Sequence, residues 1–219
     1  MILQGYFYAT ICDKYKGLNP WWVKGYTDAE GCFIINTAKA KTAKLGYTVR
    51  LIYQISTHTS DIVILQRLKE YFNNKGEVFE AAGYVHFRVT NLKDIQEVLI
   101  PHFSAYPLQS TKVVSYTLFK QVAAIISNKE HLTLDGFKKV LGLKGALYKG
   151  LDAAAVVKDS RFSDIVPFDT SNVFVKNTFK LSPYYIAGFV AAYCSFYLIV
   201  VNTNEKWANY DAGFSIAQK

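Results

Sequence analysis

The feature that most constrains this fold is an internal repeat between two stretches that lie far apart in the chain. Residues 18–33 read L-N-P-W-W-V-K-G-Y-T-D-A-E-G-C-F, and residues 181–196 read L-S-P-Y-Y-I-A-G-F-V-A-A-Y-C-S-F. In both stretches a proline stands where it suits the first turn of a helix, because its missing N–H has no partner to lose there. The repeat predicts two related units, each opening with a helix that runs into a strand.

Small residues recur at matched positions in the two predicted helices. Gly25 and Ala29 are four residues apart, and Gly188 and Ala192 have the same spacing. Residues four apart lie on one face of a helix, so each helix has a smooth strip that lets a neighbouring backbone come close. We expect the two helices to pack against each other along this helix-packing seam.

The first helix differs from the second in its last turn, which holds two carboxylates. Asp28 and Glu30 lie at the C-terminal end of the helix, where the helix dipole disfavours negative charge. This placement is poor for stability, and it indicates another use for these acids. The second helix has Ala191 and Tyr193 at the matched positions.

The patterning of the remaining chain predicts an α+β fold. Alternation of apolar and polar residues over 48–58 is typical of a half-buried strand. The predicted elements of the first unit are two strands within 32–58 joined near Lys44–Gly46, a helix at Ser60–Phe72, strands at Glu77–Glu80 and Tyr84–Thr90, a helix at Asn91–Ile100 that Pro101 stops, and helices at Ser110–Ser127 and Leu134–Lys149.

These signals divide the chain into four parts. They are an N-terminal extension (1–17), a complete first unit (18–150), a linker of weak periodicity (151–180) and a second unit (181–219). Only two predicted strands, Phe196–Asn202 and Ala212–Gln218, follow the helix of the second unit. We therefore expect a truncated second unit with an open strand edge and an apolar surface that another protein or an RNA should cover.

Charge and cysteine usage narrow the class of partner and the compartment. The net charge of +8 and a pI near 9.2 favour a polyanionic partner, although many soluble proteins are basic. Cys12, Cys32 and Cys194 are isolated. Their spacing argues against a disulfide framework or a zinc site and fits a reducing compartment.

A membrane span is the main competing interpretation of the second repeat. Residues 181–204 contain no charged side chain and are long enough to cross a bilayer. Pro183, Asn202 and the match to the first repeat instead favour a helix followed by a strand, so no membrane partner is expected. The N-terminus, M-I-L-Q-G-Y-F-Y-A-T, has the features of neither a signal peptide nor a transit peptide.

The segment W-V-K-G-Y-T-D-A-E-G-C-F resembles the signature helix of the LAGLIDADG homing endonucleases. The resemblance continues through N-L-K-D-I, Y-P-L-Q-S-T-K and S-N-K-E-H-L-T, and it covers residues 18–150. It implies an αββαββα half-domain whose four-stranded antiparallel sheet forms a DNA-binding saddle. In that family two paired signature helices each deliver one acid to metal ions at the base of the saddle.

The resemblance also implies roles for single residues. Glu30 stands where the family keeps its metal-binding acid, Gln54 where it keeps a water-organising polar residue, and Lys112 where it keeps a basic residue near the scissile phosphate. The second repeat has Tyr193 in place of the acid and Ser215 in place of the glutamine. Because both acids are needed to cut both strands, we expect a vestigial, cleavage-deficient site with no required cofactor, and Mg²⁺ only if the protein is active.

The polar face of the sheet is the predicted nucleic-acid interface. Arginine and glutamine suit base edges, and lysine suits phosphates. A solvated sheet face is the plain alternative. The candidates are Lys39, Lys41, Arg50, Gln54, His86 and Arg88, with a basic helix carrying Lys138, Lys139, Lys144 and Lys149 as a further phosphate-binding surface.

These observations leave three hypotheses. The first is a nucleic-acid-binding protein without cleavage activity that holds structured RNA in an organellar ribonucleoprotein, such as the mitochondrial ribosome or an intron RNA. The second is a Mg²⁺-dependent intron-encoded DNA endonuclease or nickase that binds duplex DNA and is completed by another chain. The third is a pseudogene product without a role. The resemblance places the protein in the mitochondrion or another organelle.

Overall fold

The computed structural model describes residues 17–147, 159–162, 164–173, 181–202 and 209–216. Residues 1–16 of the predicted N-terminal extension, about half of the predicted linker, Lys149 of the predicted basic helix and the last residues of the predicted strand to Gln218 lie outside the described residues. In chain order the helices are α2 (Pro20–Glu30), α3 (Ile62–Tyr71), α4 (Leu92–Asp94), α5 (Ile100–Ala105), α6 (Lys112–Ser127), α7 (Leu134–Leu147) and α8 (Pro183–Tyr193).

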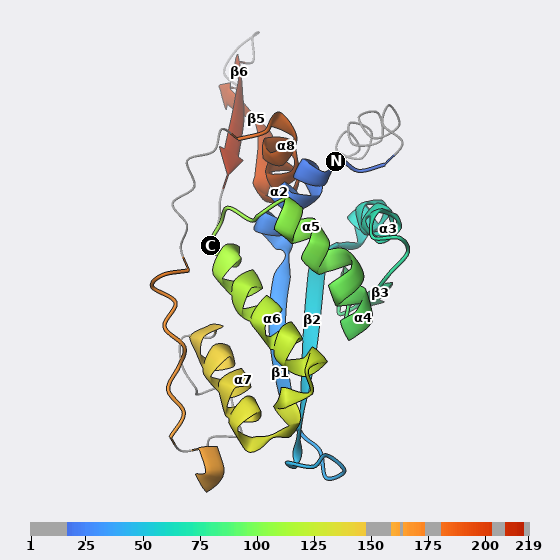
Figure 1. The fold of residues 1–219 in the computed structure, drawn as a ribbon. Coiled ribbons are helices and arrows are strands. Elements are labelled where there is room, and N and C mark those ends of the chain that lie inside the picture. Colours follow the sequence, from blue (N-terminus) through green and yellow to red (C-terminus); the bar gives the residue numbers. More distant parts are fainter. Residues whose placement is uncertain (1–16, 148–158, 163, 174–180, 203–208, 217–219) are drawn as a thin grey trace.

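The first unit is built on a four-stranded antiparallel sheet, which confirms the predicted α+β class (Figure 1). Helices α5, α6 and α7 lie over one face of this sheet, and α2 stands at one end of it (Figure 1). The strand order is β1-β2-β4-β3, with β1 at Cys32–Lys39, β2 at Tyr47–His58, β3 at Glu77–Ala81 and β4 at Tyr84–Val89.

Residues at both ends of α2 explain its bounds. The Asn19 side chain accepts a hydrogen bond from the Trp21 N–H at 2.9 Å, and Pro20 takes the first helical position. Gly31 ends the helix in an extended conformation, with its N–H still donating to the Thr27 carbonyl. A Cβ at Gly31 would lie 2.6 Å from Thr27 Cγ2, so only glycine fits where the chain leaves the helix for β1.

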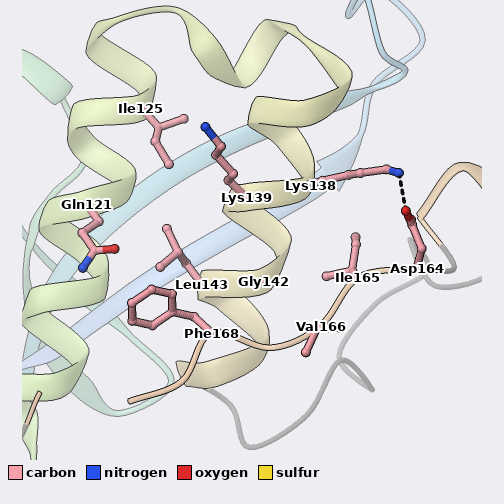
Figure 2. A pocket seen from close by; sticks show the side chains of 10 residues that line it. All are labelled: Gln121, Ile125, Lys138, Lys139, Gly142, Leu143, Asp164, Ile165, Val166 and Phe168. Atoms are coloured by element: carbon pink, nitrogen blue, oxygen red, sulfur yellow. Dashed lines mark hydrogen bonds and ion pairs between the residues drawn. The ribbon is translucent and has the colours of Figure 1, made fainter. Parts of the chain in front are cut away.

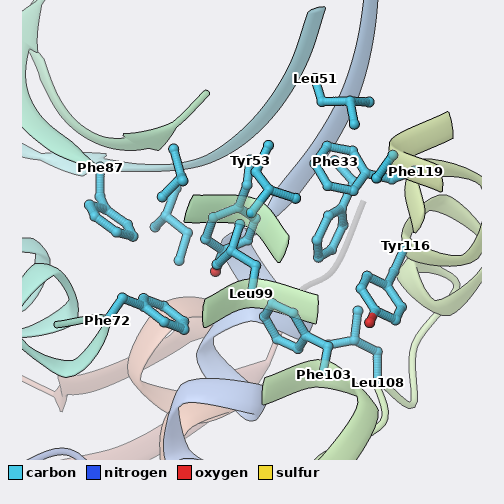
Figure 3. Close-up of a cluster of buried hydrophobic side chains, with 14 of the residues drawn as sticks. Phe33, Leu51, Tyr53, Phe72, Phe87, Leu99, Phe103, Leu108, Tyr116 and Phe119 are labelled. Atoms are coloured by element: carbon cyan, nitrogen blue, oxygen red, sulfur yellow. The ribbon is translucent and has the colours of Figure 1, made fainter. Parts of the chain in front are cut away.

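The core lies between the sheet and the helices that cover it (Figure 3). Phe33 and Ile35 of β1 are 4% and 1% exposed, and Tyr53 of β2 is fully buried. Rings of Phe103 and Phe119 pack on Phe33 with centroids 5.6 and 5.4 Å away. Each such side chain contributes roughly 1.5–3 kcal/mol by burial, which fixes this face of the sheet inward and leaves the alternate residues on the other face.

The helix predicted at Asn91–Ile100 continues past Pro101, so the expectation that proline stops it is wrong. A π-helical turn at Ile95–Leu99 joins α4 to α5, and the Ile100 N–H reaches back to the Ile95 carbonyl. The wider turn makes room for the proline ring and removes the hydrogen bond that Pro101 could not make.

His102 of α5 is a buried histidine among aromatic rings. It is 8% exposed, it packs on Phe72 and Phe103, and its Nδ1 lies 3.1 Å from the Tyr71 hydroxyl. Burial lowers the pKa of His102 to about 4. The ring therefore stays neutral in the folded protein at pH values where it takes up a proton in the unfolded chain.

This pKa difference predicts acid sensitivity. The contribution of neutral His102 to the free energy of unfolding is fully present above pH 6.5. It is lost as the pH falls toward 4, and the loss amounts to about 3 kcal/mol. Urea unfolding at pH 7 and pH 4 measures it: His102→Asn should remove most of this pH dependence. His58→Asn, at an exposed histidine, is the control and should keep it. Equal pH dependence in the wild type and His102→Asn would contradict the prediction.

The second unit repeats the helix and hairpin of the first. Helix α8 runs into β5 (Cys194–Asn202), which pairs with β6 (Asn209–Ile216). Both strands begin earlier than predicted. Phe196 and Leu198 are 72% and 76% exposed, whereas Phe33 and Ile35, their counterparts, are buried under helices. The hairpin thus shows a bare apolar face within the described part of the chain.

The helices that the structure describes include none long and apolar enough to cross a membrane.

Candidate nucleic-acid interface and cleavage site

Helices α2 and α8 pack with their backbones in contact (Figure 1). A Cβ on Gly25 would overlap the Tyr185 carbonyl oxygen and lie 3.0 Å from Phe189 N. A Cβ on Gly188 would overlap the Trp22 carbonyl oxygen. Ala29 is fully buried, and Ala192 packs on the core. The four residues of the helix-packing seam therefore lie in or beside one interface.

Asp28 connects this interface to the first unit. Its carboxylate accepts hydrogen bonds from the Gln109 and Ser110 N–H groups at 2.8 and 3.1 Å and from Ser110 Oγ at 2.7 Å. The Tyr185 hydroxyl of α8 also bonds to it, and burial beside this carboxylate raises the pKa of Tyr185. Asp28 thus has a structural role, because it ties α8 and the loop before α6 to α2.

Glu30 and Lys112 lie together at the C-terminal end of α2. The Lys112 ammonium donates to the carbonyls of Ala29 and Thr27, so it offsets the negative end of the helix dipole. Burial raises the pKa of the half-buried Glu30 carboxyl, and the nearby Lys112 charge counteracts this. Burial lowers the pKa of Lys112, whereas neighbouring groups that include Glu30 act to raise it.

Tyr193 of α8 faces this site from the matched position. Burial raises the pKa of Tyr193, and the negative charge of Glu30 raises it further. Within the described ranges no three His, Cys, Asp or Glu side chains form a metal cluster. Mg²⁺ needs only one or two carboxylates when phosphates and waters complete its shell. Glu30 fits that requirement as a protein ligand.

The outward face of the sheet carries a hydrogen-bonded polar network. Arg88 Nε donates to Gln54 Oε1 at 2.8 Å. Gln54 Nε2 in turn donates to Ser56 Oγ at 3.0 Å and lies 3.3 Å from His86 Nδ1. The Arg88 guanidinium carbon also lies over the Phe79 ring, 4.5 Å from its centroid, as in a cation–π contact. The structure therefore brings together three predicted interface residues from β2 and β4.

The other predicted interface residues are dispersed. Arg50 is exposed on the same outward face, opposite Asn36 in the strand register. Lys39 pairs with the buried Tyr47, so its side chain starts from the helix-covered face, and placing it on the polar face was wrong. Lys41 is exposed in the turn between β1 and β2.

The predicted basic helix, α7, lies on the opposite side from the polar network. Lys144 donates to Thr37 Oγ1 at 2.7 Å, and Lys138 pairs with Asp164 at 2.8 Å. A groove of about 480 Å³ lies between α6, α7 and residues 164–168. Figure 2 shows its lining, in which Lys138 and Lys139 stand beside apolar side chains such as Leu143. None of the predicted cleavage or sheet-face residues lines this groove.

Three residues of the site were not predicted from the sequence. Ser56 has the same alternation as Gln54, and this signal could have added it to the interface. Phe79 carries no such signal, because only the register that sets it opposite His86 reveals that it lies beside Arg88. Tyr185 also gave no sign of its bond to Asp28.

Comparison with known proteins agrees with this geometry. Residues 23–123 match the family described as LAGLIDADG endonuclease. The probable intron-encoded endonuclease 3 of Neurospora crassa is 32% identical over 191 residues, covering 86% of this chain and 35% of that protein. An uncharacterized 50.9 kDa protein in ND4 intron 1 of Podospora anserina is 37% identical over 140 residues, covering 61% of this chain and 31% of that protein.

Among solved structures, I-SmaMI bound to its uncleaved DNA target with calcium ions is similar, with a TM-score of 0.83 and 29% identity over 92% of this chain and 68% of that chain. These matches confirm the resemblance to the LAGLIDADG endonucleases and the half-domain fold. The chain spans about a third of the length of the two curated relatives named above.

Proposed function

We propose that this chain binds duplex DNA through its four-stranded sheet and cleaves one DNA strand with a divalent metal held at Glu30. The observation that carries the proposal is the pairing of Glu30 with Tyr193 at the adjoining ends of α2 and α8. Among the described residues there, one helix offers a carboxylate and the other does not. A site with one carboxylate supports one cleavage centre.

The relatives favour DNA cleavage over the RNA-binding role expected first. One relative is named as a probable intron-encoded endonuclease, and the structure of I-SmaMI contains an uncleaved DNA target and calcium ions. We therefore take the second hypothesis as the main proposal. The ND4 intron in the name of another relative supports placement in the mitochondrion.

The residues around Glu30 have separate tasks in this proposal. A bound Mg²⁺ would supply an activated water and stabilise the leaving oxygen. Glu30 would hold the ion together with DNA phosphate oxygens and waters. Lys112, fixed by the α2 carbonyls, would present positive charge to the same phosphate.

The exposed apolar face of the hairpin in the second unit indicates that this unit needs a partner. Phe196 and Leu198 need cover from further protein, and their counterparts in the first unit are covered by helices. We propose that residues 18–150 form one complete half-domain, that 151–180 link it to the second unit, and that additional protein completes the second unit from residue 181 on.

The bare hairpin is also the one observation that favours the alternative of a stable RNA-protein assembly. Aromatic and apolar side chains such as Phe196 and Phe214 could contact a permanent partner in an organellar ribonucleoprotein. A structured RNA therefore belongs in the test as a competitor.

The test is a plasmid assay with the 219-residue chain. A supercoiled plasmid carrying a duplex site selected by the protein from a random library should become nicked circle with Mg²⁺, remain intact with EDTA, and show no linear product. Structured RNA should compete only weakly for the duplex. Linear product, metal-independent nicking or preferential RNA binding would contradict the proposal.

A further inference from the structure

We propose that Arg88 reads a guanine in the DNA major groove, and that Gln54 and Phe79 position its guanidinium for this contact. The inference rests on the proposed DNA-binding function and adds a preferred base to it. It assigns Gln54 a positioning role on the sheet face in place of a base-reading one.

The first step is the fixed orientation of the guanidinium. Its Nε–H is bonded to Gln54 Oε1 at 2.8 Å, and its Cζ lies over the Phe79 ring, 4.5 Å from the ring centroid. These two contacts use the Nε edge of the group and hold its centre over the ring. No hydrogen bond to the two terminal nitrogens is present in the described part of the chain, so the outer edge keeps its N–H donors for a ligand.

The second step is the fixed orientation of the Gln54 amide. Its Nε2 donates to Ser56 Oγ at 3.0 Å and approaches His86 Nδ1 at 3.3 Å. His86 Nε2 lies 3.3 Å from the Ala81 carbonyl, an acceptor that requires the ring proton on Nε2 and leaves Nδ1 to accept. A flipped amide would point its N–H groups at Arg88 Nε, donor against donor, so the network permits one orientation.

The third step is the chemistry that fits the free edge. Two parallel N–H donors match the O6 and N7 acceptors of guanine, which lie side by side in the major groove. Because the amide hydrogens of Gln54 are already bonded, Gln54 cannot use them to read an adenine edge. Arg50 lies on the same face, opposite Asn36, with none of these supports. It serves as the matched control for a general phosphate contact.

The experiment measures Kd for the selected duplex and for variants of it that carry each other base pair at every position. Wild type should lose about tenfold or more in affinity when one particular guanine is replaced. Arg88→Lys should abolish this preference at that position alone, because an ammonium cannot make the paired contact. Gln54→Ala should weaken the same preference more than it weakens binding of duplexes that lack that guanine, a difference that a role in fold stability alone would not produce.

Arg50→Ala, by contrast, should weaken all duplexes evenly and lower the salt dependence of binding. Wild type without any guanine preference, or Arg88→Lys with the wild-type preference, would overturn this inference while leaving DNA binding in place. Absence of duplex binding by the wild type would overturn the proposed function and this inference together.

Discussion

Replacement of Glu30 by glutamine should abolish metal-dependent nicking of a cognate plasmid, with the rate falling at least about 100-fold, or roughly 3 kcal/mol in activation free energy. Glutamine keeps the shape of the side chain but removes the negative charge that would hold the cation. The Lys112 ammonium is also left without its neighbouring carboxylate. DNA affinity in EDTA should change little, because the sheet face is untouched.

The matched control for this change is Glu70→Gln. Glu70 is an exposed glutamate in the last turn of α3, so it shares residue type and helix-end placement with Glu30 but not the site. Its variant should nick at the wild-type rate. Full activity in Glu30→Gln would show that the metal is held elsewhere.

Replacement of Gly188 by leucine should break the contact between α2 and α8. The new Cβ would overlap the Trp22 carbonyl, and backbone cannot move aside as a flexible side chain would. We expect the free energy of unfolding to fall by about 3 kcal/mol in urea titrations. Amide hydrogens of α8 should lose protection before those of the first unit, because the helix is held mainly by this contact.

Ala187→Leu is the control for added volume on the same helix. Ala187 is the preceding residue and is exposed, so its variant should change stability by no more than about 0.5 kcal/mol. Unfolding curves that coincide for the two variants would mean that the seam contributes nothing to stability.

The pattern of residues determined most of the helices and strands and the face of each on which a side chain lies. The repeated proline, glycine and alanine spacing was enough to predict two helices that pack through small residues, because one helix face follows directly from a spacing of four. Alternation in β2 likewise predicted which residues face the core, since a strand turns its side chains to opposite sides at each step. Lys39 is an exception, because its charge suggested the polar face whereas its position in the alternation of β1 places it on the helix-covered face.

Only the tertiary structure decided which residues that are distant in the chain come into contact. Asp28 is bound by backbone N–H groups of residues 109 and 110, and nothing in its own helix signals them. Pro101 continues a helix because a π-helical turn precedes it. Gln54 and Arg88 become one unit through the register of β2 and β4. Sequence periodicity sets the face on which a side chain lies, whereas the partner across that face depends on how separate elements align in space.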